Sequence, residues 1–71
     1  MSDELYRVRA DVAGHTKYWT GEMRGRWPIY LADPRLAWGC SRRLAERYAA
    51  AFSLVAPKIK WSIEPSEPSE P

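Results

Sequence analysis

The sequence predicts a small α+β fold in which one helix packs on one face of an antiparallel or mixed sheet of three to four strands. Two observations lead to this class. Apolar residues alternate with polar ones near both ends of the chain, as in half-buried strands, and recur at helical spacing over residues 42–54. A chain of 71 residues has room for one such domain. The expected element order is β-β-(β)-α-β.

The first two elements are predicted to form an antiparallel hairpin. In residues 5–12, apolar side chains alternate with charged ones such as Arg7 and Arg9, so the two kinds occupy opposite faces of a strand. Residues 17–21, Lys-Tyr-Trp-Thr-Gly, are rich in the aromatic and β-branched side chains that strands favour. A glycine-containing turn at residues 13–16 joins the two segments.

Glycine and proline interrupt the middle of the chain, so its assignment stays open. The polar residues 22–26 are predicted to form a mobile loop. Residues 27–31 resemble a short strand, which their proline confines to a sheet edge or a strand start. Asp33 precedes a proline and is typical of a turn or a helix start. A helix from Asp33 would run through Trp38; we favour the alternative, a short extended piece over residues 36–40.

A helix over residues 42–54 is the clearest element, and Ser41 is its expected N-cap. A proline ends it, and residues 58–64 alternate again and predict a last strand that returns by a right-handed crossover. Residues 65–71 repeat Ser-Glu-Pro and are predicted to be a disordered tail, so the folded domain is assigned to residues 1–64. The expected inward stripe of the helix contains Leu44, Tyr48, Ala51, Phe52 and Val55.

Positive charge is concentrated in the predicted domain. Residues 1–63 contain all eleven Lys and Arg but only six acids, a balance of +5, whereas the last eight residues contain three Glu. This distribution favours an acidic partner, either nucleic acid or an acidic protein face. No segment is long and apolar enough to cross a bilayer, and the N-terminus lacks the features of a signal peptide. We therefore expect a cytoplasmic protein with no membrane partner.

No residue pattern points to catalysis or to a metal site. His15 is the only histidine and has no acid nearby in the sequence, so it forms no obvious catalytic pair. Cys40 is the only cysteine, which excludes an internal disulfide and a cysteine-based zinc site. The glycines form no phosphate-binding fingerprint. The sequence thus predicts a non-enzymatic protein with no cofactor and no metal.

Basic residues interleaved with aromatic ones are the best candidates for a binding site. Arginines hold phosphates or carboxylates, and an exposed aromatic ring stacks on a base or fills a pocket. If the last strand pairs with the first, basic residues of both strands would share the sheet face away from the helix. The ordinary alternative is a charged face that keeps the sheet solvated. The candidate binding residues are Arg7, Arg9, Arg24, Arg26, Trp27, Lys58 and Lys60.

The order of several short segments resembles that of many small phage and prophage proteins with a ββ(β)αβ fold. An aromatic strand ends in Thr-Gly, a tryptophan follows, and a serine-capped helix with an Ala-Glu pair leads to a final strand. The segments concerned are Lys17-Tyr18-Trp19-Thr20-Gly21, Trp27, Asp33-Pro34-Arg35-Leu36-Ala37 and Ser41-Arg42-Arg43-Leu44-Ala45-Glu46.

Where proteins of this kind have an assigned role, it is often inhibition of a host defence complex, as in the anti-CRISPR proteins. The resemblance therefore implies a partner in the bacterial host: a protein or ribonucleoprotein complex with an acidic surface. The alternative hypothesis is a small nucleic-acid-binding or regulatory protein that uses the same basic residues on phosphates.

Overall fold

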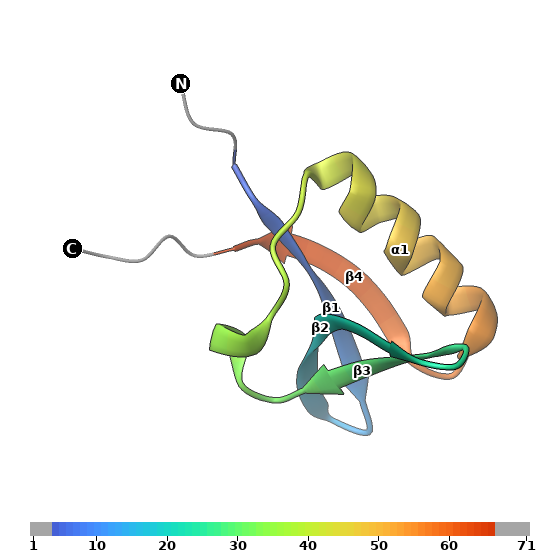
Figure 1. The fold of residues 1–71 in the computed structure, drawn as a ribbon. Helices are drawn as coiled ribbons and strands as arrows, with labels where there is room; N and C mark the ends of the chain where they lie inside the picture. Colours follow the sequence, from blue (N-terminus) through green and yellow to red (C-terminus); the bar gives the residue numbers. More distant parts are fainter. Residues whose placement is uncertain (1–3, 67–71) are drawn as a thin grey trace.

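A computed structural model describes residues 4–66, which form a four-stranded sheet with one helix on one of its faces (Figure 1). All strand pairings are antiparallel, in the order β3-β2-β1-β4, so the predicted α+β class is confirmed. The elements are β1 (Tyr6–Val12), β2 (His15–Arg24), β3 (Trp27–Leu31), the 3-10 turn η1 (Pro34–Leu36), α1 (Arg42–Val55) and β4 (Lys60–Pro65).

Strands β1 and β2 form the predicted hairpin. Its turn is shorter than expected, because Ala13 and Gly14 alone connect the strands and Val12 already pairs with His15. Both turn residues have positive φ, 50° and 84°. Two successive residues of this conformation match the right-handed twist of the flanking strands, which explains the two-residue connection.

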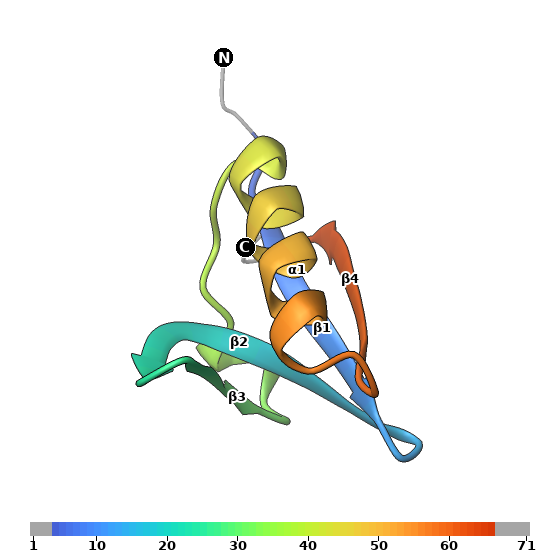
Figure 2. The same ribbon diagram turned by 90° about the vertical axis from the view of Figure 1, so that its right-hand side faces the viewer.

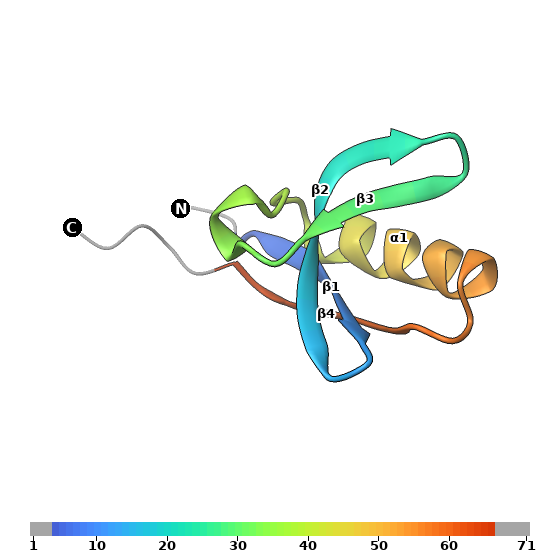
Figure 3. The same cartoon turned by 90° about the horizontal axis from the view of Figure 1, so that it is seen from below.

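The predicted mobile loop over residues 22–26 is wrong. Strand β2 continues to Arg24, which pairs with Trp27 of β3, so only a tight turn at Gly25 separates the two strands. The polar residues stay in a strand because β3 supplies a partner for their backbone. A register shift between Trp19 and Met23 bends β2, and its second half leaves the plane of β1 and β4 together with β3 (Figure 3).

The segment between β3 and α1 is mostly extended, as we favoured. Asp33 caps only the single turn η1, where its side chain accepts a hydrogen bond from Arg35 N at 2.9 Å. A helix through Trp38 does not form, because the Trp38 N–H instead donates to Trp19 O at 2.9 Å. Cys40 then exchanges two backbone hydrogen bonds with Tyr6, which ties this segment to β1.

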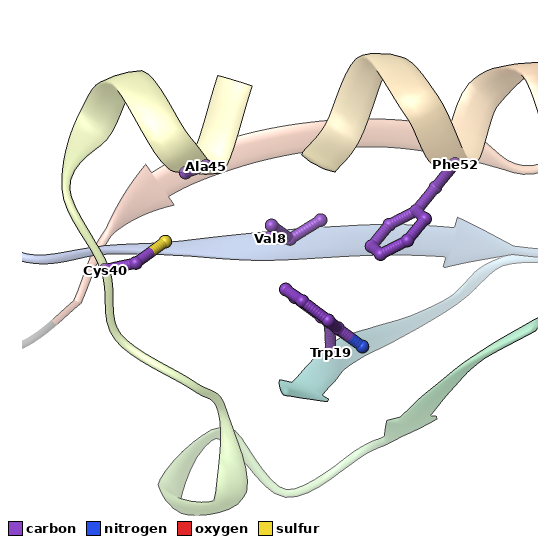
Figure 4. Packing of buried hydrophobic residues seen from close by; sticks show 5 residues of the cluster. All are labelled: Val8, Trp19, Cys40, Ala45 and Phe52. Carbon is purple, nitrogen blue, oxygen red and sulfur yellow. The ribbon is translucent and has the colours of Figure 1, made fainter. Parts of the chain in front are cut away.

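Helix α1 begins at the expected cap, where Ser41 Oγ accepts from Leu44 N at 3.2 Å. It lies over β1 and β4 (Figure 2). The side chains packed between helix and sheet include Val8, Trp19, Cys40, Ala45 and Phe52 (Figure 4), with Tyr48, Ala49, Trp61 and Ile63 partly buried beside them.

The buried helix face differs from the predicted stripe. Tyr48 and Phe52 point inward as expected, but Leu44, Ala51 and Val55 are exposed. The small Ala45 takes the place predicted for Leu44, which is 40% exposed. The helix adopts this rotation because the Tyr48 and Phe52 rings both pack on Trp19, with centroids 4.6 and 4.9 Å away, and alanine lets the helix approach the sheet closely.

Strand β4 runs antiparallel to β1 and forms one edge of the sheet. The predicted right-handed crossover is therefore wrong, since that connection joins parallel strands. The strand continues to Pro65, and the Ser66 N–H donates to Leu5 O at 2.7 Å, so the predicted boundary at residue 64 falls inside β4. The rest of the predicted disordered tail, residues 67–71, lies outside the described residues.

Candidate binding surfaces

Two of the predicted binding residues, Arg7 and Arg9, lie on the open sheet face and are paired within the domain. Arg7 donates to Glu64 Oε2 through Nε at 2.7 Å and through Nη2, and Arg9 Nη1 lies 3.2 Å from Glu64 Oε1. The Arg7 side chain is only 11% exposed, and its guanidinium lies 4.5 Å from the centroid of the Tyr18 ring. These arginines hold the sheet face together, and little of their charge is left for a partner.

Lys60 shares the open sheet face with these arginines, as expected, but stands opposite neither of them, and Lys58 lies outside β4. Opposite Arg7 and Arg9, β4 places Glu64 and Ser62, whereas Lys60 stands opposite Asp11. The reason is the antiparallel register, which brings the end of β4 to the start of β1. Lys58 precedes β4, in the connection that follows α1, and is exposed. The open sheet face is therefore a network of alternating charges.

Asp11 is the second acid of this network. Its Oδ1 accepts a hydrogen bond from the Thr16 hydroxyl at 3.0 Å and one from Arg9 Nε at 3.2 Å. The Thr16 hydrogen bond contributes most to lowering the pKa of Asp11; partial burial opposes this, and the Arg9 guanidinium and Lys60 lower it further. The carboxylate is thus better stabilised in the folded chain than in the unfolded one.

This depressed pKa sets a pH dependence of stability. A carboxyl group with a lower pKa in the folded state stabilises the fold above its unfolded pKa of about 3.9, and this contribution is lost as the pH falls through the folded pKa. We expect Asp11→Asn to lower the melting temperature at neutral pH, with a difference from the parent that shrinks as the pH falls below about 4. Thermal unfolding followed by circular dichroism over a pH series measures this.

A second variant separates the pKa effect from other consequences of the substitution. Thr16→Val removes the hydroxyl donor and raises the folded-state pKa of Asp11 toward its unfolded value, so the acid-induced loss of stability should be smaller than in the parent and should be complete at a higher pH. A melting temperature of Asp11→Asn that stays at a constant distance below the parent down to strongly acidic pH would contradict this account.

The other predicted binding residues gather at the turn between β2 and β3, which we call the hairpin tip (residues 24–27). Arg24 and Trp27 are cross-strand neighbours and Arg26 lies in the turn. All three side chains are exposed, and the Trp27 side chain is 54% exposed. Within residues 4–66, neither Arg24 nor Arg26 forms a salt bridge. The tip therefore presents two uncompensated guanidinium groups beside an indole ring.

The hairpin tip is held in place by the residues behind it. Trp19 Nε1 donates to Glu22 O at 2.8 Å, and Pro28 is buried and pairs with Met23. The connection between α1 and β4, which contains Lys58, lies at the same end of the molecule, but the C-terminal end of α1 separates it from the hairpin tip (Figure 3). Lys58 and the tip are thus separate basic features at one end of the fold.

The sequence reasoning missed an apolar strip on the outer side of α1. A shallow pocket of about 260 Å³ is lined by Leu44, Arg47, Tyr48 and Ala51, and Leu54 beyond it is 85% exposed. Leu44, Tyr48 and Ala51 share a helical spacing in the sequence, which predicted that all three face the core. A second hollow, of about 300 Å³, lies beside β3 and η1 and is lined by Thr20, Glu22, Ile29, Leu31 and Leu36.

Titratable residues do not gather into a reactive or metal-binding cluster in the described part of the chain. No group of three His, Cys, Asp or Glu side chains within residues 4–66 could hold a metal ion. His15 is exposed at the start of β2, whereas Cys40 is buried, and burial raises the pKa of its thiol. None of the helices in residues 4–66 has the length and apolar character needed to cross a membrane.

The fold and these surfaces define a small antiparallel α+β domain with an exposed basic and aromatic hairpin tip. Comparison with protein-family models, with curated proteins and with solved structures gave no match to the chain.

Proposed function

We propose that the chain is a non-catalytic binding protein that docks on an acidic surface of a protein or ribonucleoprotein complex through its hairpin tip. The observation that carries this proposal is the contrast between two sets of arginines. Arg7 and Arg9 are compensated by Glu64 and Asp11, whereas Arg24 and Arg26 have no acidic partner in residues 4–66. Arginine and tryptophan are the residues most often found as anchors at protein interfaces.

The β2–β3 hairpin that carries the tip, which we call the hairpin arm, also suits recognition. Paired backbones on both sides of Gly25 and the hydrogen bond from Trp19 to Glu22 O support the tip in the free protein. Binding then costs less free energy, because the backbone of the tip is already ordered before the partner arrives. Arg24 and Trp27 lie directly opposite each other, so one acidic residue beside a shallow apolar depression could engage both.

The resemblance of the sequence to small phage and prophage proteins suggests a biological role for the proposed binding. We propose inhibition of a host defence complex in the cytoplasm of a bacterial cell, of the kind that anti-CRISPR proteins perform. Such inhibition requires occupancy of a functional surface and no chemistry by the inhibitor. An exposed, pre-arranged arm with uncompensated positive charge suits that task.

A nucleic-acid partner is the second candidate, and the same tip supports it. Two guanidinium groups can hold phosphates while the exposed Trp27 ring stacks on a base. The two candidates differ in their response to salt. Contacts with phosphates release condensed counterions, so affinity for nucleic acid falls steeply as the salt concentration rises, and contacts dominated by a buried anchor at a protein interface depend on salt less strongly.

The test of the proposed function removes both arginines of the tip. Arg24→Ala with Arg26→Ala should leave the fold intact, since surface substitutions usually change stability by less than about 0.5 kcal/mol. Binding to a partner recovered from nuclease-treated bacterial lysate should weaken by about 2 kcal/mol or more, which is roughly 30-fold. Surface plasmon resonance at low and high salt measures the loss, and a labelled single-stranded oligonucleotide is the probe for the second candidate.

The matched control is Arg43→Ala with Arg47→Ala, which removes the same charge from the exposed side of α1. This variant should bind nearly as well as the parent. If the helix pair abolishes binding and the tip pair does not, recognition occurs on α1 and the tip proposal is wrong. If only the oligonucleotide binds, and its affinity falls steeply with salt, the nucleic-acid candidate replaces the proposed one.

A further inference from the structure

Strand β4 leaves one edge of the sheet open within the described chain, since no segment of residues 4–66 pairs with its outer side (Figure 2). Both backbone groups of Tyr6 bond to Cys40, so its pair with Pro65 is not hydrogen-bonded. Bonded and non-bonded pairs alternate along an antiparallel ladder. The backbone N–H and C=O groups of Trp61 and Ile63 therefore point outward and are available to another strand.

The charge pattern along this edge is self-complementary, with Lys60 near one end of β4 and Glu64 near the other. Lys60, Ser62 and Glu64 alternate with Trp61 and Ile63, so they share the open face of the sheet. We propose that a second copy of this chain pairs with β4 in the antiparallel direction, with Ser62 on the two-fold axis. Lys60 of each copy then stands opposite Glu64 of the other, and Trp61 of each copy exchanges both backbone hydrogen bonds with Ile63 of the other.

The neighbouring registers are worse for identifiable reasons. A shift toward the C-terminus places Pro65 opposite Trp61, and proline has no N–H to donate. A shift toward the N-terminus requires the N–H of Ile59, which already donates to Ala56 O at 3.1 Å. The register centred on Ser62 satisfies every outward backbone group of Trp61 and Ile63 and forms both ion pairs.

The same features explain why the pairing stops at two copies. A contact that each copy makes with the same surface is closed, and it uses up the β4 edge of both chains. The opposite edge of the sheet, β3, contains Pro28 and pairs irregularly with β2 across the register shift, which makes it a poor template for a further strand. The dimer is therefore one continuous sheet that ends in β3 on both sides.

The test is the mass of the protein in solution, measured by sedimentation velocity from low micromolar to millimolar concentration. The parent should shift from monomer to dimer as the concentration rises. Ser62→Glu places two carboxylates opposite each other on the two-fold axis, whereas in the monomer the new carboxylate lies opposite Arg9. It should weaken dimerisation by about tenfold or more, because like charges face each other, and leave the circular dichroism spectrum unchanged.

A cross-linking experiment fixes the register. Residues on the axis form a non-bonded pair with Cα atoms about 4.5 Å apart, a distance that a disulfide spans. Ser62→Cys should therefore form a disulfide-linked dimer under mild oxidation far faster than the control His15→Cys, whose side chain is exposed in the β1–β2 hairpin. A protein that is monomeric at every concentration overturns the proposal, as does equal cross-linking of the two variants. A dimer that Ser62→Glu leaves intact and Leu54→Glu dissolves also overturns it, because the contact would then lie on α1.

Discussion

Trp19→Ala is expected to remove most of the stability of the protein. Trp19 is 2% exposed, and its ring lies 5.2, 4.6 and 4.9 Å from the ring centroids of Trp38, Tyr48 and Phe52. Truncating a buried tryptophan to alanine costs about 3–5 kcal/mol through lost burial and the cavity left behind. That is comparable to the whole free energy of unfolding of a small domain, which begins at about 5 kcal/mol. The lost hydrogen bond from Nε1 to Glu22 O also frees the base of the hairpin arm.

Urea denaturation followed by circular dichroism measures this change. The control is Leu44→Ala, which removes an aliphatic side chain from the same helix that Trp19 packs against. Because Leu44 is 40% exposed, its truncation should cost less than about 1 kcal/mol. A Trp19→Ala protein with a nearly normal unfolding midpoint would show that the aromatic cluster is not the core of the fold. A large loss in Leu44→Ala would show instead that the helix is rotated as the sequence pattern predicted.

Gly21→Ala is expected to have the second-largest effect. Gly21 has φ of 89°, and a Cβ atom at this position would lie 2.8 Å from Cγ of Trp38. A residue other than glycine at such a φ costs roughly 1–2 kcal/mol. Forcing an extra carbon into a packed site adds roughly 1–3 kcal/mol. Gly21 lies within the register shift of β2 between Trp19 and Met23, so the substitution should strain this bend as well as the Trp38 contact.

Gly14→Ala is a matched control for the backbone contribution. Gly14 has a similar φ of 84°, but nothing lies within 4 Å of where its Cβ would be. The difference in unfolding free energy between the two variants therefore measures the collision with Trp38. Adding Trp38→Ala to Gly21→Ala removes the contacts with Cγ and Cδ1 of Trp38 and leaves only its Cβ, at 3.0 Å, so the double variant should be more stable than the sum of the two single effects predicts. Equal losses in Gly21→Ala and Gly14→Ala would contradict the close approach of Trp38.

Part of the candidate binding site could be predicted from the sequence, and part of it could not. The exposed Arg-Gly-Arg-Trp run was recognisable in the sequence because it has no apolar pattern to bury. The compensation of Arg7 was not, because its partner Glu64 is 57 residues away along the chain. Only the antiparallel register of β4 decides which acid stands opposite which arginine. Arg7 and the arginines of the hairpin tip look alike in the sequence, but within residues 4–66 only those of the tip have a charge that is free to meet a partner.

Local patterns in the sequence determined the hairpin around Gly14, the helix with its Ser41 cap and the last strand. These elements depend on side-chain alternation, capping and turn residues within a few positions of each other. The tertiary structure decided the rotation of α1, since Leu44 and Ala45 are adjacent in the sequence and the choice between them depends on how Trp19 packs. It also decided that residues 22–26 are mainly strand, because their backbone hydrogen bonds need β3 as a partner.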